Sequence, residues 1–402
     1  MSGLASQHNQ QMECGKMTAA NDASMSVAQF EDHAARTDQL EFGEIGTSIL
    51  GLVGEVGSLV SAVKKKRRDT DGFFGYRDAV VEELGDVLWY LSAVARRGGS
   101  SLVNLTRGLH HGPNFATFDN AVATQRTETL ESALLGLAGG TGHLAKRKGA
   151  ETKDTDVAAL HNDLSYILGL LGEVARAAEV TLTEAAIRNV VKTEDRWPTQ
   201  RVFPPLLDEG LHIDEQLPRQ MRVLIYEREV NGTRFVFQKA GGFLLGDRLT
   251  DNHLPEDDFR FHDVFHLAYA AVLGWSPTTR ALLKIKRKSQ KALDENEDGA
   301  RANLIEEGLT TWIFETAKQH RFFANTPKLG LDILKDVKRF VRGYEAEKLP
   351  MWLWESAILQ GYAVFRQLQT ARIGVVLTDL NRREIWFEDM TSEDRESCGM
   401  KD

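Results

Sequence analysis

Two acidic side chains one helical turn apart could hold a metal ion. Glu83 and Asp86 are three residues apart in an apolar stretch, residues 80–91, whose hydrophobic residues recur at helical spacing. Residues three apart share one side of a helix, so the two carboxylates meet there. Neighbouring anions repel unless a cation lies between them, and a hard ion such as Mg²⁺ binds carboxylate oxygens. The alternative is a solvated acidic face, which is the commoner fate of acids on helices.

A second apolar stretch, residues 48–63, carries Glu55 in its middle. It is apolar nearly all round, which predicts a helix buried between other helices. A lone carboxylate in such a place needs a partner or an ion. Its three glycines weaken a helix by about 1 kcal/mol each relative to Ala, which is usually explained by close approach of another helix. A polar turn at 67–72 follows, so we expect antiparallel neighbours, with Glu55 facing Glu83 and Asp86.

These stretches resemble the MazG-type all-α nucleoside triphosphate pyrophosphohydrolases, which include dCTP pyrophosphatases and dimeric dUTPases. The resemblance covers about residues 28–110 and is carried by LVGEVGSL at 52–59 and EELGDVLWYL at 82–91. The family pattern is E-x-x-E on one helix and E-x-x-D on the next, with four carboxylates holding Mg²⁺. Carried over, Glu55 matches the first Glu, and Glu83 and Asp86 match the E-x-x-D pair. The resemblance implies Mg²⁺- or Mn²⁺-dependent conversion of a nucleoside triphosphate to its monophosphate and pyrophosphate.

The sequence departs from that pattern at one ligand. Ser58 stands where the family has its second Glu, and a hydroxyl is a neutral, poorer ligand. Glu82 is a substitute carboxylate, although it lies one residue further round the helix. Two interpretations follow. The protein is either a hydrolase, or a weakened nucleotide-binding or sensing protein whose C-terminal domain carries the output.

The helical pattern of residues 30–110 recurs in residues 118–197. In the second copy Gly140 replaces Glu55 and Tyr166 replaces Asp86, and only Asp163 retains an acid, at the position of Glu83. We therefore expect the second copy to be degenerate and structural.

The second copy, in turn, has basic residues that the first lacks. The stretch 189–196, NVVKTEDR, resembles the phosphate-binding C-terminal helix of the family through Asn189, Lys192 and Arg196, where the first copy has LHH at 109–111. Our hypothesis is a fused pseudo-dimer, with acids from the first half and basic groups from the second around one site. The alternative is that Lys192 and Arg196 lie at a helix C-terminus, where the helix dipole favours cations.

Four further residues are candidate substrate contacts. Trp89 and Tyr90 follow Asp86 by one turn, where the family stacks the base on aromatic side chains. A Trp on this helix could equally belong to the core. Lys64 and Lys65 open a basic run that could reach phosphate, or that is a solvated helix end.

Residues beyond about 200 predict a separate, helix-dominated α+β domain that resembles the C-terminal domain appended to some MazG-like proteins. Asn231-Gly232 lies between two β-rich stretches and predicts a hairpin with a type I′ turn. A second hairpin is expected at 373–387. Helices are expected at about 262–274, 277–292, 300–322, 328–346 and 351–370, and the basic stretch 280–291 is interpreted as a solvated helix rather than a phosphate- or nucleic-acid-binding one.

This domain contains a second candidate metal site. His262 and His266 are four residues apart on one helix face, the spacing of a two-histidine site. Glu306 and Glu307 could complete it, with Asp263, or Glu297 and Asp298, supporting the ligands. The alternative is a buried hydrogen-bonded cluster that joins helices.

The composition is that of a globular protein of 402 residues with a net charge of −9, which argues against broad nucleic-acid binding. The two cysteines, Cys14 and Cys398, lie in the tails and fit a reducing cytoplasm. We expect no apolar run long enough to span a membrane.

The predicted protein is mainly α: a tandem all-α helical bundle followed by a helix-dominated α+β domain with β-hairpins. We expect a homodimer that acts in nucleotide-pool control or phage defence. The expected boundaries are a disordered tail at 1–27, a helical half with the acidic site at 28–112, a degenerate half at 113–199, the α+β domain at 200–390 and a tail at 391–402.

Overall fold

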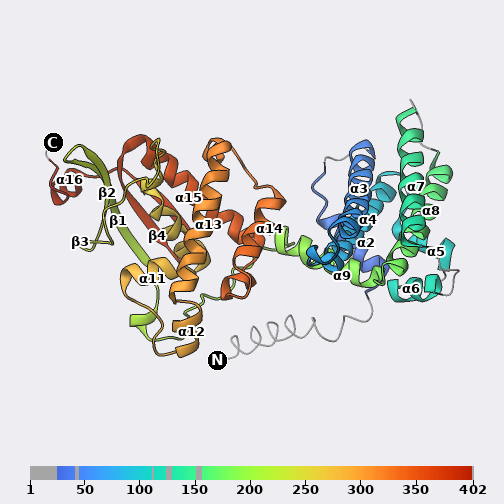
Figure 1. Ribbon diagram of the computed structural model, residues 1–402, viewed down its shortest axis with the longest axis horizontal. Coiled ribbons are helices and arrows are strands. Elements are labelled where there is room, and N and C mark those ends of the chain that lie inside the picture. Colours follow the sequence, from blue (N-terminus) through green and yellow to red (C-terminus); the bar gives the residue numbers. More distant parts are fainter. Residues whose placement is uncertain (1–24, 41–44, 111–112, 124–128, 151–155, 401–402) are drawn as a thin grey trace, which may run out of the picture. The chain divides into compact units, whose positions relative to one another are not determined.

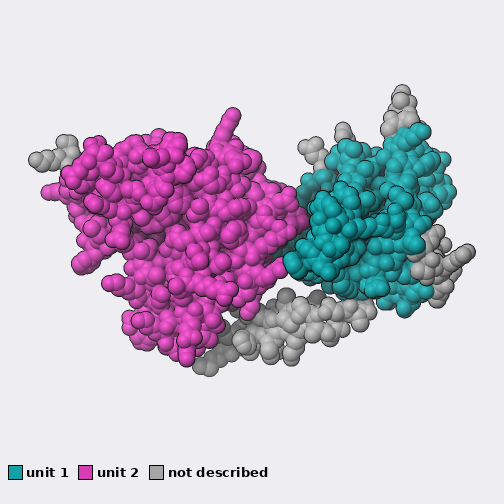
Figure 2. Space-filling view, in the orientation of Figure 1, with its two compact units in different colours: residues 1–200 teal, residues 201–402 magenta. Residues whose placement is uncertain are grey.

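The computed structural model divides the chain into two compact units, Met1–Gln200 and Arg201–Asp402 (Figures 1 and 2). It describes residues 25–40, 45–110, 113–123, 129–150 and 156–400. Cys14 and nearly all of the predicted N-terminal tail lie outside these residues. Ser26 and Val27 do not belong to a tail, because Ser26 caps the first described helix and Val27 is buried.

The first unit is all helical over its described residues, and two sets of four helices follow each other in sequence (Figure 1). The first set is α2 (Val27–Arg36), α3 (Ile45–Asp69), α4 (Tyr76–Arg97) and α5 (Leu102–His110). The second set is α6 (Phe115–Ala123), α7 (Leu130–Ala150), α8 (Val157–Ala177) and α9 (Leu182–Arg196).

The apolar faces that the sequence predicts for α3 and α4 pack against each other. Leu52, Val56 and Leu59 of α3 are buried, as are Leu84 and Leu88 of α4. The approach is close because one of the α3 glycines has no side chain: a Cβ on Gly51 would lie 2.0 Å from the ring of Tyr90. The mainly α fold class is confirmed.

Contacts in the two helix sets match each other. The amide of Leu102, at the start of α5, donates to Glu31 of α2 at 2.7 Å. The amide of Leu182, at the start of α9, donates to Asp119 of α6 at 2.9 Å. The last helix of each set packs on the third helix of the other, α9 on α4 and α5 on α8.

One helix of the first unit, Ile45–Gly72 with its terminal turn, is long and apolar enough to cross a membrane by length and composition. The expectation that no apolar run has this length is therefore wrong. The core helix of a soluble protein passes the same test, and α3 packs against α4 and α7.

The second unit contains an antiparallel five-stranded sheet with strand order β3-β2-β1-β4-β5. Both predicted hairpins are present. Asn231 and Gly232 have φ of 53° and 79°, as a type I′ turn requires, and join β1 to β2. The strands are β1 (Gln220–Val230), β2 (Thr233–Ala240), β3 (Phe243–Leu244), β4 (Ile373–Asp379) and β5 (Glu384–Glu388).

Helices make up most of the rest of the second unit. The core helix is α15 (Met351–Ala371), which contacts α10, the π-turn that follows it, and β5. The others are α10 (Asp263–Ala268) with its π-turn (Tyr269–Leu273), α11 (Pro277–Leu283), α12 (Lys291–Asn296), α13 (Ala300–Gln319), α14 (Leu331–Phe340) and α16 (Ser392–Ser397).

The predicted helix at 277–292 is wrong. It ends after α11 because Lys284 adopts a left-handed conformation, with φ of 60°. Arg280 and Arg287 are not solvated but fully buried, since each is paired with a buried carboxylate. These partners are Asp208, 2.9 Å from Arg280, and Asp298, 2.8 Å from Arg287.

The predicted tail at 391–402 is also wrong over its described residues. Thr391 and Asp394 form a capping box at the start of α16. Cys398 is buried in a small cluster with Leu224 and Val375 of the sheet. A capped helix with an apolar anchor is an ordered part of the unit.

The crossing of α4 and α9 should depend on Gly85. A Cβ there would lie 2.6 Å from the carbonyl oxygen of Ala185, so α9 must move away. We expect Gly85→Ala to lower the free energy of unfolding by about 1–3 kcal/mol. Gly139→Ala is the control, because a Cβ there meets nothing within 4 Å, and it should be stabilising by about 0.5–1 kcal/mol. Equal stabilities in urea unfolding would contradict this account.

Candidate functional site

The three predicted metal ligands of the first unit lie together. Glu55 comes from α3, and Glu83 and Asp86 come from α4. One oxygen from each carboxylate lies within 4.8 Å of those of the other two, and all three residues are half-buried. Three carboxylates at this spacing form a strongly anionic, oxygen-only centre that solvent can reach.

Helix α9 places amide and ammonium donors beside these acids. Asn189 Nδ2 donates to Asp86 Oδ1 at 2.8 Å. Lys192 Nζ contacts both oxygens of Asp86, at 2.5 Å for Oδ2, and lies 3.3 Å from Glu82 Oε1. Glu82 therefore faces Lys192 and is not part of the three-acid group. Residues 103 or more positions apart in sequence thus meet at one carboxylate.

The position of α9 is fixed from two other directions. Arg77 of α4 binds the carboxylate of Glu184, at 2.7 Å for one of two hydrogen bonds. His33 of α2 is buried, and its Nε2 lies 2.8 Å from Oγ1 of Thr193, the residue that follows Lys192 in the sequence. Burial lowers the pKa of His33, an effect that the charge of Glu194 only partly offsets. A neutral His33 is the form that this packing favours.

Four other predicted residues lie on α3 and at the end of α9. Ser58 is exposed, one turn after Glu55 on α3. Lys64 and Lys65 are also exposed, and nine or ten residues of helix place them about 14 Å beyond Glu55 along the axis. The guanidinium of Arg196 lies over its neighbouring Trp197 ring, 4.3 Å from the centroid.

The two aromatic residues after Asp86 have different surroundings: Trp89 lies in the core and Tyr90 lies near the acids. Trp89 is only 8% exposed, and its indole N–H donates to Thr37 Oγ1 at 3.2 Å. This burial and the hydrogen bond favour the alternative, in which Trp89 belongs to the core. Tyr90 is partly buried, and burial together with the charges of Glu55 and Asp86 raises its pKa. Its side chain thus adjoins the acids.

A cavity of about 460 Å³ opens beside the crossing of α4 and α9. Its lining residues are Asp78, Val81, Thr181, Thr183, Glu184, Ile187, Arg188 and Val191. None of the three acids lines it, although Val191 precedes Lys192.

The second unit gathers a different set of ligand atoms. His262, Asp263 and His266 each offer one within 4.8 Å of the others, and all three residues are buried. Glu307 approaches both histidines, 3.9 Å from His262 Nε2 and 3.3 Å from His266 Nε2. Glu306 instead faces the Nδ1 atom of His266, at 2.8 Å.

The residues predicted to support the histidine ligands do not lie behind them. Asp263 lies among the ligand atoms rather than behind them. Glu297 and Asp298 are elsewhere, because Asp298 binds Arg287 and Glu297 accepts a hydrogen bond from the amide of Glu345.

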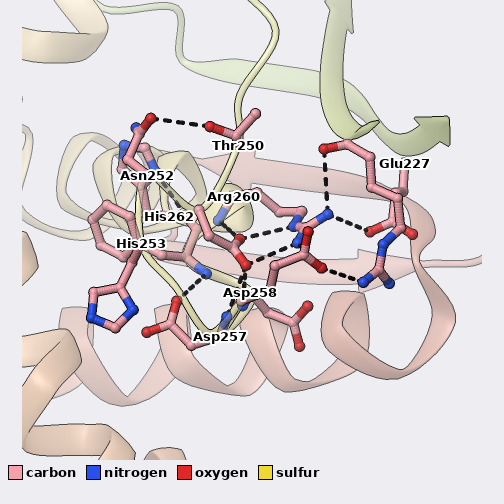
Figure 3. Close-up of polar contacts among 12 residues, drawn as sticks. Glu227, Thr250, Asn252, His253, Asp257, Asp258, Arg260 and His262 are labelled. Carbon is pink, nitrogen blue, oxygen red and sulfur yellow. Dashed lines mark hydrogen bonds and ion pairs between the residues drawn. The ribbon is translucent and has the colours of Figure 1, made fainter. Parts of the chain in front are cut away.

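A buried ion-pair network holds the chain just before His262 (Figure 3). Arg260 donates to both oxygens of Asp251, at 2.8 and 2.9 Å. Glu227 of β1 lies 3.5 Å from Arg260 and 2.5 Å from Arg372 at the end of α15. Burial alone would raise the pKa of Asp251, but the hydrogen bonds from Arg260 and the nearby amides lower it to about 2. This network ties the start of α10 to the sheet and to α15.

The pKa values of the two histidines shift in opposite directions. Burial lowers the pKa of His262, and Asp263 opposes this effect. Burial would also lower the pKa of His266, but the carboxylates of Glu306 and Glu307 outweigh it and raise that pKa well above its usual value. Without a metal ion, these two carboxylates therefore favour the protonated form of His266.

Two protein-family models match parts of the chain. Residues 44–104 match the MazG nucleotide pyrophosphohydrolase domain, and residues 202–391 match the MazG C-terminal domain. The chain carries a MazG-type domain followed by a MazG C-terminal domain. The first match spans α3 and α4 and contains all three clustered acids, so the resemblance drawn from the sequence is confirmed for both parts.

One relative matches part of the chain. The Gene 37 protein of Mycobacterium phage L5 is 46% identical over 50 residues, which are 12% of this chain and 44% of that protein. The chain therefore covers less than half the length of this relative. No solved structure matches the chain significantly. The family that residues 44–104 match is that of the MazG nucleotide pyrophosphohydrolase domain, which has nucleotide substrates and is generally metal-dependent.

Two features of the MazG-type domain were not predicted from the sequence. Gly85 lies within the 82–91 motif, but the motif alone did not predict that this glycine permits the contact with α9. The pairing of Glu82 with Lys192 was also missed. The sequence held a signal for each: Glu82 and Lys192 carry opposite charges, and Gly85 is the small residue of the 82–91 stretch.

Trp89 should act as a core residue and not as a substrate contact. We expect Trp89→Phe to lower the free energy of unfolding by about 1–3 kcal/mol, since it loses buried volume and a hydrogen bond. The KM for nucleotide should change by less than about twofold, because no direct contact is lost. Trp386→Phe, at a partly exposed tryptophan of β5, is the control. A large rise in KM without loss of stability would restore the stacking role.

Proposed function

We propose that the MazG-type domain hydrolyses a nucleoside triphosphate, ribo or deoxy, to its monophosphate and pyrophosphate with Mg²⁺ or Mn²⁺. The observation that carries the proposal is the meeting of Lys192 and Asn189 with Asp86 in the three-acid group. One half of the helical unit supplies the anions that hold a metal ion, and the other supplies donors suited to phosphate oxygens.

The acids fit a hard divalent ion. Glu55, Glu83 and Asp86 offer oxygen ligands only, within 4.8 Å of one another, and they are half-buried rather than sealed. When bound, Mg²⁺ would neutralise polyphosphate charge and favour ionisation of the attacking water.

Lys192 has two roles in this proposal. In the protein alone it balances the negative charge of Asp86 and Glu82. When an ion occupies the acids, it no longer has to supply that charge and can donate to a phosphate oxygen. Asn189 keeps Asp86 oriented through its amide during the exchange.

The matched contacts of the two helix sets support a fused pseudo-dimer. Each set caps its last helix with an acid from its first helix, and each last helix packs on the other set. In the second set Asp163, the counterpart of Glu83, is paired with Arg147 at 2.8 Å. That acid is committed to a structural ion pair, so the proposal places a single active site at the acids of the first set.

Pyrophosphate release from a panel of canonical and damaged nucleoside triphosphates tests the activity. We expect release with Mg²⁺ or Mn²⁺ from the wild type, and a loss on the order of 100-fold for Glu83→Gln, because one of three metal-holding charges is removed. Asp163→Asn is the matched control and should retain most of the activity. Equal rates for the wild type and Glu83→Gln would refute the assignment of the acids.

The contribution of the second helix set is tested by its cation. We expect Lys192→Met to raise KM by about tenfold or more, since a charged hydrogen bond to phosphate is lost. Lys64→Met and Lys65→Met should change KM by less than about twofold, because these residues lie about 14 Å along α3 from Glu55. A dominant effect of Lys64 or Lys65 would contradict the composite site.

A second function is favoured by one observation, Ser58 at the fourth ligand position. In this alternative the domain binds nucleotide without cleaving it, and the MazG C-terminal domain carries the output. Nucleotide binding without pyrophosphate release, together with a large gain of activity in Ser58→Glu, would support this alternative over hydrolysis.

A further inference from the structure

Both histidines of the cluster in the second unit direct Nε2 toward the carboxylates, because Nδ1 of each ring already has a hydrogen-bond partner. His262 Nδ1 lies 2.9 Å from the carbonyl oxygen of Phe259. A carbonyl only accepts, so Nδ1 carries the proton and the lone pair of the neutral ring is on Nε2. His266 Nδ1 lies 2.8 Å from Glu306 and donates to that carboxylate in the same way. Metal-binding histidines characteristically donate their other ring N–H to a carbonyl or carboxylate.

Glu306 is itself held in place as an acceptor. It is fully buried, and it accepts hydrogen bonds from Ser276 Oγ at 2.7 Å and from the amide of Thr278 at 2.8 Å. A carboxylate fixed by three donors keeps the ring of His266 in one orientation. Phe259 does the same for His262, because the two rings stack with centroids 4.3 Å apart.

The two Nε2 atoms meet carboxylate oxygens at distances that suit a shared ion. His262 Nε2 lies 3.2 Å from Asp263 Oδ1 and 3.9 Å from Glu307 Oε2, and His266 Nε2 lies 3.3 Å from Glu307 Oε1. Ligands about 2.1 Å from a tetrahedral ion are about 3.4 Å apart. These separations therefore bracket the spacing of a tetrahedral site.

A buried ring nitrogen with a poorly placed partner points to the same place. His266 is 1% exposed, and its Nε2 lies 3.3 Å from Glu307 Oε1 without making a hydrogen bond to it or to the other described residues. The second oxygen of Asp263 is occupied by the side-chain amide of Gln238, which leaves Oδ1 toward the histidines. A buried ring nitrogen without a hydrogen bond is rare and calls for an explanation.

We propose that His262, Asp263, His266 and Glu307 bind a divalent first-row transition metal ion in the MazG C-terminal domain. Two imidazole nitrogens with two carboxylates suit Zn²⁺, Mn²⁺, Fe²⁺ or Co²⁺ better than Mg²⁺. Glu307 is the solvent-facing ligand, since its side chain is 42% exposed, and Glu306 is a positioning residue. The chain thus has two metal sites of different chemistry, one of oxygen ligands only and one of nitrogen and oxygen ligands.

Metal analysis of the full-length protein tests this proposal. The protein is stripped with a chelator, dialysed against Zn²⁺ or Mg²⁺ and desalted, and its metal content is measured by mass spectrometry. We expect about one retained Zn²⁺ per chain and no retained Mg²⁺. Loading with Co²⁺ should give the intense visible absorption of a four-coordinate ion. A wild-type protein that retains no Zn²⁺ and gives only the weak Co²⁺ spectrum of a hydrated ion would overturn the proposal.

Variants separate this site from the acids of the MazG-type domain. His262→Gln and Asp263→Asn should lose the retained Zn²⁺, whereas His253→Gln, at an exposed histidine of the same unit, should keep it. Glu83→Gln should keep it as well. Glu306→Gln should weaken Zn²⁺ binding by about 10–100-fold while the Co²⁺ spectrum of the loaded protein keeps its shape. Unchanged Zn²⁺ in folded His262→Gln and Asp263→Asn, checked by circular dichroism, would leave only a hydrogen-bonded cluster.

Discussion

The contact between Lys192 and Asp86 is the interaction on which the first unit depends most. Three carboxylates within 4.8 Å of one another repel in a half-buried place, where water screens them poorly. An ammonium from another part of the chain offsets that repulsion in the absence of an ion. Helix α9 can supply it only because Gly85 lets the two backbones approach. The packing of the bundle and the chemistry of the site therefore rest on the same helix crossing.

In the second unit, buried charges are balanced by ion pairs within the unit. Arg260, Arg280 and Arg287 are fully buried, and each is matched to a buried carboxylate. Removing one partner of such a pair leaves an uncompensated charge, so these networks fix the loops that carry them. One network anchors the chain just before His262, which places the histidine cluster on a rigid support. Rigid support is what a metal site needs to keep its ligands in register.

Sequence reasoning predicted most of the fold and part of the sites, for physical reasons. Helical periodicity and the Asn231-Gly232 turn are local signals, so the helical unit and the hairpins were predictable. The end of α11 was not, because Lys284 adopts a left-handed conformation that its residue type does not favour. The burial of Trp89 and the position of Asp263 beside the two histidines depend on tertiary packing, which spacing along one helix cannot show.

The central claim is that one site takes its anions from the first helix set and its donors from the second. The most direct measurement is a crystal structure with Mn²⁺ and a nucleoside triphosphate analogue that cannot be cleaved between the α- and β-phosphates. We predict anomalous density for Mn²⁺ at Glu55, Glu83 and Asp86, with Lys192 moved from Asp86 to a phosphate oxygen. Mn²⁺ and phosphates bound away from these acids, with Lys192 still on Asp86, would contradict the account.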